Sequence, residues 1–332
     1  MPEFSVIVPT FDRRDAVLRC LDALERQSLP PDRFEVLIAD DGSRDGTREA
    51  VEARALTVPF ALRVIACEHG GPATARNAAA ALARGEWLAF TDSDAAAEPE
   101  WLERARARCD AGAEALAGDI APTVGGSFRA LDDRSSPIVS AANLFVRRAA
   151  FERLGGFDES YRELRWGIYF REDADLGFRL LESGARIEAA HNAVVRHAPS
   201  FSTTASCFAH ARRYYLDSLL YRRHPRAYRS LIERKRIGPL TISRPAHYLS
   251  LLYTLVLTML AACLARRAFG AALALAAAAF ALQGPVLYRY QRRMWMDLAR
   301  PARALALTVL PPHYLYWLIR GCLRHRTLGP LL

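Results

Sequence analysis

The first hundred residues alternate between short β-branched runs and longer segments whose apolar residues recur at helical spacing. The predicted strands are residues 5–9, 34–39, 62–67 and 87–91, and the predicted helices are residues 14–27, 45–54 and 72–84. Strands that alternate with helices favour a mostly parallel sheet covered by helices on both faces. The sequence therefore predicts an α/β fold for this part of the chain.

Acidic side chains follow three of the four predicted strands. Asp12 follows the first strand, Asp40 and Asp41 follow the second, and Asp92 and Asp94 follow the fourth. The carboxyl ends of parallel strands meet at one edge of a sheet, and ligands bind beyond that edge. We therefore expect these carboxylates to lie near one another in a ligand site.

Each acidic cluster also has a simpler explanation when it is taken alone. Residues 40–43 suit a turn and a helix cap, and residues 92–94 suit a turn before a helix. Glu172, Asp173 and Asp175 are equally typical of the start of a solvated helix. Together the three clusters indicate a ligand site, because all are expected at one edge of the same sheet.

The combination suits group transfer from a nucleotide diphosphate. A carboxylate after the second strand can accept hydrogen bonds from a nucleoside. The Asp92 and Asp94 carboxylates are two residues apart, so both can face the same way and coordinate Mg²⁺ or Mn²⁺. A later carboxylate at the start of a helix can act as general base toward a hydroxyl group.

Two uncharged apolar runs lie in the C-terminal third, at residues 248–265 and 268–288. Each approaches the roughly 20 residues that a membrane-spanning helix needs, and together they predict a helical hairpin. The flanks on both sides are basic, which places them in the cytoplasm. Arg266 and Arg267 in the turn oppose that placement, so an interfacial or re-entrant hairpin stays open. Residues 305–319 form a possible third membrane-associated segment, interrupted by two prolines.

Positive charge gathers in the same region as the apolar runs. The net charge is +9, and Asp297 is the one acidic residue after Glu233. This overlap favours an anionic membrane surface as partner and argues against nucleic acid. Residues 201–228 predict an amphipathic, arginine-rich helix, which suits either the membrane interface or an ordinary domain surface.

The N-terminus and the cysteines indicate the compartment. No basic segment precedes the first apolar run, so the N-terminus does not resemble a signal peptide, and we expect a cytoplasmic catalytic domain on the membrane. The six cysteines have neither metal-ligand spacing nor a disulfide pattern, which indicates a reducing compartment. The expected organisation is a catalytic domain at residues 1–200, an interfacial helical linker at 201–245, a membrane hairpin at 246–290 and a basic tail at 291–332.

A series of segments resembles the family 2 glycosyltransferases, which have the GT-A fold. The segments that carry this resemblance are residues 4–13 (Phe-Ser-Val-Ile-Val-Pro-Thr-Phe-Asp-Arg), 40–47, 71–78, 91–94, 143–148, 155–159 and 172–179. They span about residues 4–200, in the order and spacing of the family. The resemblance implies an inverting transfer of sugar from a UDP-, GDP- or dTDP-sugar to a saccharide or a lipid-linked acceptor.

The resemblance also implies roles for individual residues. Asp173 maps onto the catalytic base, and Asp94 maps onto the direct ligand of Mg²⁺ or Mn²⁺. His197 matches the position of a further metal or diphosphate ligand, although a lone histidine is more often structural. The implied donor-binding residues are Pro9, Asp12, Asp41, Arg76, Asn77 and Asp92, and the implied acceptor-binding residues are Trp166 and Glu172. A structural salt bridge for Arg76 and plain packing for Trp166 are the alternatives.

One motif of the processive polysaccharide synthases in this family is missing. Between Asp173 and the apolar runs there is no Gln-x-x-Arg-Trp sequence, and residues 291–295 resemble it only superficially. This favours transfer of single sugars. Two other functions stay open, namely nucleotidyl transfer to a sugar phosphate and a catalytically degenerate scaffold subunit that only binds the donor.

Overall fold

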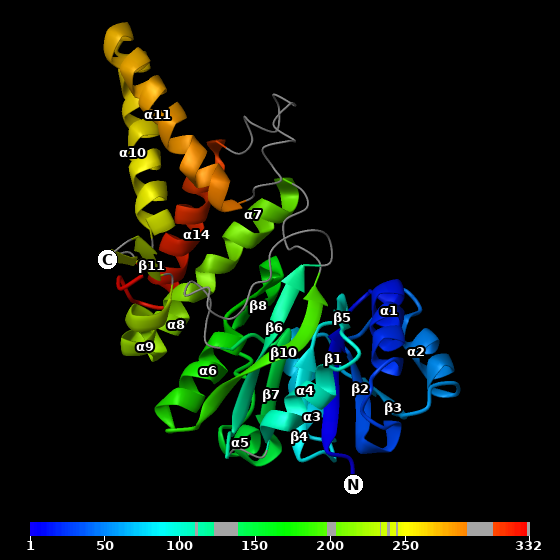
Figure 1. Cartoon of the computed structure of the whole chain (residues 1–332). Helices are drawn as coiled ribbons and strands as arrows, with labels where there is room; N and C mark the ends of the chain where they lie inside the picture. The colour runs from blue at the N-terminus through cyan, green and yellow to red at the C-terminus, as the bar shows by residue number, and fades with distance from the viewer. Residues whose placement is uncertain are drawn as a thin grey trace. The chain divides into compact units, whose positions relative to one another are not determined.

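The computed structural model describes residues 1–109, 112–122, 139–197, 204–232, 234–237, 240–243, 245–290 and 308–330. The chain divides into two compact units, Met1–Pro199 and Ser200–Leu332. Figure 1 shows an α/β unit at the N-terminus and a helical unit at the C-terminus.

The first unit contains a sheet of eight strands in the order β3-β2-β1-β4-β7-β6-β10-β5. The strands are β1 (Phe4–Thr10), β2 (Phe34–Asp40), β3 (Ala61–Ala66), β4 (Trp87–Thr91), β5 (Ala95–Ala97), β6 (Ala115–Pro122), β7 (Asn143–Arg147) and β10 (Ile187–His197). Strands β3, β2, β1 and β4 run parallel, as do β6 and β10, whereas β7 and β5 pair antiparallel with their neighbours. The predicted α/β fold with a mostly parallel sheet is confirmed.

Helices cover both faces of this sheet. They are α1 (Arg14–Glu25), α2 (Thr47–Ala55), α3 (Pro72–Ala80), α4 (Trp101–Cys109), α5 (Arg148–Arg153) and α6 (Glu172–Glu182), with a 3-10 turn, η1, at Pro31–Arg33. Alternate side chains of β1 enter different cores: Val6 and Val8 pack with α1 and α4, while Ile7 packs with α3 and α6. Burial on both faces explains why these strands read as continuous apolar runs.

The second unit is mainly helical. Its elements are α7 (Thr204–Arg213), η3 (Tyr214–Leu216), α8 (Asp217–Arg223), α9 (Pro225–Leu231), β11 (Arg234–Ile237), β12 (Leu240–Ser243), α10 (Pro245–Ala265), α11 (Phe269–Tyr290) and α14 (Leu310–Arg324). The prediction of one helix over residues 201–228 is wrong within the described residues, because the chain breaks into α7, η3, α8 and α9. Pro225 explains the last break, since proline lacks the N–H that a continuous helix needs.

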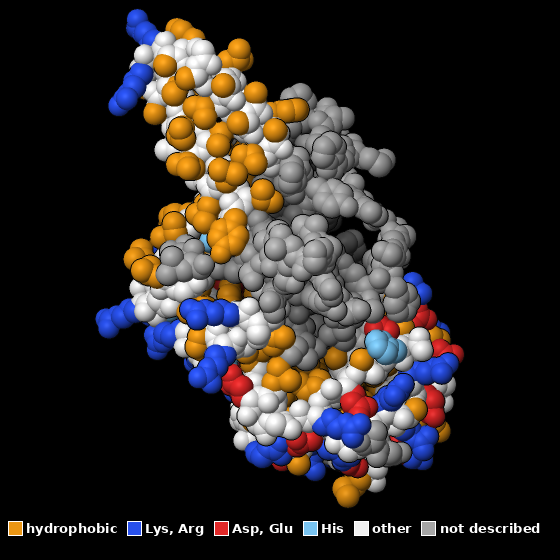
Figure 2. All heavy atoms as spheres, turned by 60° about the vertical axis from the view of Figure 1, so that its left-hand side comes forward, with side chains coloured by type: hydrophobic (Ala, Val, Ile, Leu, Met, Phe, Trp, Pro, Cys, Tyr) orange, Lys and Arg blue, Asp and Glu red, His pale blue; other side chains and the backbone are white. Residues whose placement is uncertain are grey.

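Helices α10 and α11 form a hairpin. Tyr253 and Val256 of α10 pack against Ala279 of α11, and the backbone N–H of Ala268 donates to the carbonyl of Cys263 to close α10. Figure 2 shows hydrophobic side chains over the outside of this hairpin and basic ones at its far end. Among the described residues, one helix is long and apolar enough to cross a membrane by length and composition, at His247–Ala265 with a mean hydropathy of 2.0. The apolar part of α11, Phe269–Leu282, is shorter.

The prolines near the C-terminus begin a helix, contrary to the expected interruption. Pro311 and Pro312 occupy the first turn of α14, where the missing N–H groups would have no helical partner. Residues 305–307 of the predicted segment, together with Asp297 and residues 291–295, lie outside the described residues.

Candidate functional site

An acidic cluster forms where β4 ends and β5 begins. The N–H of Ala95 donates to the Asp92 carbonyl at 3.0 Å, which closes a turn around Ser93. Strand β5 then pairs antiparallel with β10, with His197 opposite Ala95. This register brings ligand atoms of Asp92, Asp94 and His197 within 4.8 Å of one another.

The imidazole of His197 lies between the two carboxylates. Its Nε2 is 3.4 Å from Asp92 Oδ2 and 3.2 Å from Asp94 Oδ1. Burial by itself would lower the pKa of His197, but hydrogen bonds to Asp92 and Asp94 and their charges raise that pKa to about 10. The same contacts hold the pKa of both aspartates below their usual range despite burial. Both carboxylates are therefore ionised at neutral pH, which is the form that ligates a cation.

The donor set of this cluster fits a divalent cation. Two carboxylate oxygens suit Mg²⁺ and Mn²⁺, and an imidazole nitrogen that converges with them favours Mn²⁺ as the softer of the two. All three side chains are partly buried. Ligation by His197 requires loss of its proton, so metal and proton compete for this nitrogen.

Arg76 joins this cluster to helix α6. The guanidinium of this α3 residue lies 2.8 Å from Asp92 Oδ1 and 3.1 Å from Glu172 Oε1, and the residue is only 4% exposed. The structural salt bridge that was an alternative for Arg76 is therefore present. Because the bridge spans the end of β4 and the start of α6, it sets the spacing between the acidic cluster and Asp173.

Glu172 and Asp173 begin α6 directly after a residue with strained backbone. The preceding residue, Arg171, has φ of 78°, which is unusual for a residue with a side chain. Burial raises the pKa of Asp173, partly offset by the N–H of Ala174, which donates to Oδ1 at 2.7 Å. Burial and the charge of Asp173 likewise raise the pKa of Glu172. A raised pKa makes Asp173 a stronger base than an exposed aspartate.

Asp41 holds the loop that precedes α3. Its two carboxylate oxygens accept from the N–H groups of Gly70 at 2.8 Å and Gly71 at 2.9 Å. Its Oδ2 also lies 2.9 Å from Nδ1 of His69. In this structure the carboxylate thus positions the backbone of the loop, in addition to lying at the carboxyl end of β2.

Three aromatic rings stand beside Asp41. Phe11 stacks on His69 with ring centroids 4.2 Å apart, and the Tyr169 hydroxyl lies 3.2 Å from His69 Nε2. Since a carboxylate only accepts hydrogen bonds, we assign the proton to Nδ1, and Nε2 then accepts from Tyr169. Sequence reasoning missed these residues, although an aromatic residue next to Asp12 was a usable signal.

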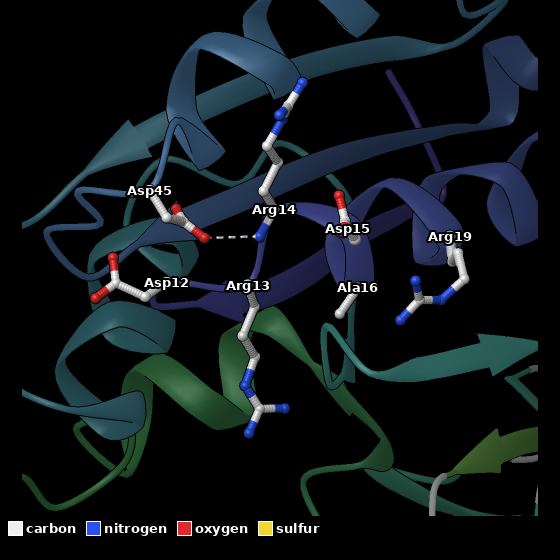
Figure 3. Close-up of a pocket in the computed structure, with 7 residues that line it drawn as sticks. All are labelled: Asp12, Arg13, Arg14, Asp15, Ala16, Arg19 and Asp45. Atoms are coloured by element: carbon white, nitrogen blue, oxygen red, sulfur yellow. Dashed lines mark hydrogen bonds between the residues drawn. The ribbon is translucent and has the colours of Figure 1, made fainter.

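Asp12 and Arg13 directly precede α1. Asp12 has φ of 48°, and its carboxylate accepts from the N–H of Arg44 at 2.7 Å. Figure 3 shows the side chains of Arg13 and Arg14 leaving the chain in opposite directions, with the Arg14 N–H donating to Asp45. The Arg13 guanidinium pairs with Asp94 Oδ2 at 2.5 Å, so this cation, which sequence reasoning also missed, lies against the acidic cluster.

Three predicted residues lie apart from the acidic cluster. Pro9 is buried within β1. The Asn77 amide donates to the Phe157 carbonyl at 2.8 Å and accepts from the Phe157 N–H at 2.9 Å, so it holds that loop. Trp166 lies in η2 (Leu164–Trp166), between strands β8 (Arg162–Glu163) and β9 (Ile168–Tyr169), with the Arg165 guanidinium 5.7 Å from its ring centre.

Comparison with known proteins connects this geometry to a family. The profile described as Glycosyl transferase family 2 matches residues 5–176, and that described as Glycosyl transferase family group 2 matches residues 123–320. The sheet topology and its acidic edge define the GT-A class of nucleotide-diphospho-sugar transferases. Within that class, the chain belongs to glycosyl transferase family 2.

Several relatives are informative. Glycosyltransferase AglE of Haloferax volcanii is 30% identical over 171 residues, which cover 47% of this chain and 56% of AglE. The poly(ribitol-phosphate) beta-N-acetylglucosaminyltransferase TarS of Staphylococcus aureus is 36% identical over 110 residues, 33% of this chain and 19% of TarS. The matched regions therefore span less than two thirds of these relatives.

Solved structures extend the likeness over nearly the whole chain. The mannosyltransferase PcManGT from Pyrobaculum calidifontis, in complex with GDP-Man and Mn²⁺, has a TM-score of 0.61 and 26% identity. That match covers 93% of this chain and 86% of PcManGT. A TarS structure in complex with UDP has a TM-score of 0.50 at 18% identity, covers 95% of this chain and 92% of that one, and supports the fold.

Proposed function

We propose that this protein transfers a sugar, with inversion, from a nucleotide-diphosphate donor to a hydroxyl group of a saccharide or lipid-linked acceptor. The observation that carries the proposal is the Arg76 bridge, which holds the metal-binding cluster next to Glu172 and Asp173. A donor site and a general base at fixed spacing are what metal-assisted transfer to a hydroxyl requires.

The donor end of the site lies along the carboxyl edge of β1, β2 and β4. The exposed ring of Phe11 offers a stacking surface for a nucleobase beside Asp12 and Asp41. Asp92, Asp94 and His197 would hold Mn²⁺ or Mg²⁺, which, when bound, neutralises charge on the diphosphate leaving group. Arg13 lies close enough to the cluster to add a second positive charge there.

The acceptor end begins at α6. Asp173 would take the proton from the acceptor hydroxyl, and the oxygen would then attack the anomeric carbon opposite the diphosphate. Burial of Asp173 raises its pKa and so favours proton uptake. Glu172 and Trp166 are the proposed acceptor contacts, because both belong to the segment that leads into or starts α6.

The membrane is part of this proposal. The apolar helix His247–Ala265 and the basic character of the second unit support attachment to the cytoplasmic face of a membrane. TarS is named for transfer to a poly(ribitol-phosphate), and that relative supports an envelope glycan precursor as acceptor here. We place the catalytic unit, residues 1–200, on the cytoplasmic side.

Binding of the donor can be tested without knowledge of the acceptor. The detergent-purified protein would be heated with a panel of nucleotide-sugars, with Mn²⁺ and with chelator. A ligand that binds only the folded state raises the unfolding temperature by mass action, so one donor should do so only with Mn²⁺. Failure of every UDP-, GDP- and dTDP-sugar to raise it would contradict the proposal and favour a degenerate scaffold subunit.

A further inference from the structure

The exposed charge of the second unit is entirely basic over the side chains that the structure describes. The one carboxylate among them, Asp217, is fully buried and accepts from the Tyr228 hydroxyl at 2.7 Å. The outward arginines include Arg222, Arg223, Arg226, Arg324 and Arg326. A surface with arginines and no exposed acid is complementary to an anionic partner.

Helix α14 has two apolar faces. Tyr314, Leu318 and Cys322 are buried against α7 and its neighbours. The opposite stripe, formed by Tyr316, Ile319 and Leu323 at spacings of three and four, is exposed by 52%, 43% and 71%. A water-facing helix surface is normally polar, so this stripe indicates a contact with something apolar.

Arg320 lies on the border of this stripe. Its guanidinium donates to the Tyr316 hydroxyl at 2.6 Å and stacks within 5.8 Å of the Tyr316 ring centre and 5.6 Å of the Trp317 ring centre. Arginine next to tyrosine and tryptophan is the composition found where hydrocarbon meets lipid headgroups.

The buried face of α14 packs against the N-terminal end of α10. The Tyr314 hydroxyl is 3.4 Å from Nδ1 of His247, and Leu249 packs on the cluster that contains Leu310. From this end, α10 continues with exposed Tyr248 and further exposed leucines toward its apolar middle. Helix α14, which carries the stripe on its other face, therefore adjoins the helix with the composition of a membrane span.

We propose that the outward face of α14, with Arg320 and Arg324, binds the headgroup layer of an anionic bilayer. The apolar stripe enters the boundary of the hydrocarbon, and the two guanidinium groups contact lipid phosphates. This inference rests on the membrane attachment in the proposed function and adds which surface makes contact and which lipid charge it selects. Among the described side chains, the combination of a basic surface with an apolar stripe on a helix that packs against α10 favours lipid over a protein partner.

A fluorescent label can report the surroundings of α14 in the full chain. In a Cys67→Ser/Cys263→Ser background, which keeps the four buried cysteines, Leu323→Cys would carry an environment-sensitive dye. Leu56→Cys is the matched control, because Leu56 is an exposed leucine of the first unit close to Glu49 and Glu52. Both variants would be placed in nanodiscs of phosphatidylcholine and phosphatidylglycerol.

We expect spin-labelled lipid to quench the dye at position 323 several-fold more than the dye at position 56. Aqueous iodide should quench the two in the opposite order. Equal access of iodide to both positions would overturn the proposal and leave a protein partner as the occupant of this face. Metal-dependent stabilisation by a nucleotide-sugar, measured on the same samples, shows separately whether the donor site works.

The charge selection has its own test. Arg320→Gln/Arg324→Gln should lower lipid quenching at position 323, with the larger decrease in nanodiscs that contain phosphatidylglycerol. Arg104→Gln/Arg108→Gln, which changes two exposed arginines of α4, is the control for net charge and should leave the quenching unchanged. An equal decrease in nanodiscs of phosphatidylcholine alone would contradict selection of anionic lipid.

Discussion

At the scale of single residues, Asp173 is the side chain on which the proposed chemistry most depends. Asp173→Asn keeps the shape but removes the base, so we expect turnover to fall by about 100- to 10,000-fold. Donor affinity, measured by metal-dependent thermal stabilisation, should stay near the wild-type value. Glu182→Gln removes an exposed carboxylate from the other end of α6 and should leave turnover unchanged. Near-normal turnover in Asp173→Asn would assign the base elsewhere.

His197 makes metal binding depend on pH. Its raised pKa, about 10, means that the imidazole carries a proton at neutral pH in the metal-free protein. Since a ligating nitrogen must lose this proton, Mn²⁺ affinity should rise with pH, by up to about tenfold for each pH unit below 10.

Calorimetry can count that proton. Mn²⁺ titrations in buffers with different ionisation enthalpies should show the release of about one proton for each ion bound at neutral pH. His197→Asn should abolish the release, whereas His191→Asn, on an exposed position of the same strand, should preserve it. Binding to wild type without proton release would remove His197 from the ligand set.

At the scale of elements, Arg76 ties α3 to β4 and α6. Arg76→Met leaves Asp92 and Glu172 without their shared countercharge, so we expect a loss of about 3 kcal/mol in the free energy of unfolding. This is the low end for a buried pair, because the Asp92 side chain is still 27% exposed. Arg106→Gln breaks ion pairs with Glu103 and Glu3 at the surface and should cost about 1 kcal/mol or less. Denaturant unfolding of both variants would measure the difference, and equal losses would argue against a buried bridge.

Gly71 allows the hairpin of β8 and β9 to lie against the loop that precedes α3. Its φ is +96°, and a Cβ there would lie 2.2 Å from Cε1 of Tyr169. Gly71→Ala should therefore displace the loop held by Asp41 and weaken donor binding by about tenfold or more. Gly155→Ala imposes a similar backbone strain at φ of +77° where a Cβ has open space, and it should keep donor affinity. Donor titrations that rank the two variants equally would contradict this account.

The elements differ in how well sequence predicted them. The first four strands were predicted to within a residue. Both faces of β1, β2 and β4 are buried and their apolar runs are continuous, whereas β3 is only partly buried. The prediction of a single helix over residues 201–228 is wrong. It follows from the spacing of arginines and tyrosines and gives too little weight to Pro225, where a new helix begins. In the sequence, Pro311 and Pro312 predict an interruption of the apolar segment at residues 305–319. Proline also suits the first turn of a helix, which is where both residues lie in α14.

At the scale of the whole molecule, the first unit contains its own two hydrophobic cores. We therefore expect residues 1–199 alone to fold, to remain soluble without detergent and to keep metal-dependent donor binding. Circular dichroism and thermal stabilisation by the donor would test this. An insoluble fragment, or one that binds donor only with the second unit present, would show that the units depend on each other.

The candidate site was predictable where a short segment carries a complete chemical pattern. Asp92 and Asp94 are two residues apart, and the resemblance to the family supplied His197 and Asp173. The contacts among Phe11, His69 and Tyr169 were not predictable, because they join three segments whose pairing depends on how the sheet and the hairpin pack. The ion pair of Arg13 with Asp94 needed three-dimensional positions for the same reason.

The pairing of β5 with β10 has a consequence for biosynthesis. About a hundred residues separate Asp94 from His197, and closing so long a loop is slow compared with local folding. A nascent chain that has not yet released β10 from the ribosome lacks one of the three proposed ligand side chains. A cation held by all three would therefore lock only a chain whose first unit is fully synthesised, and its capture would mark a late step of maturation.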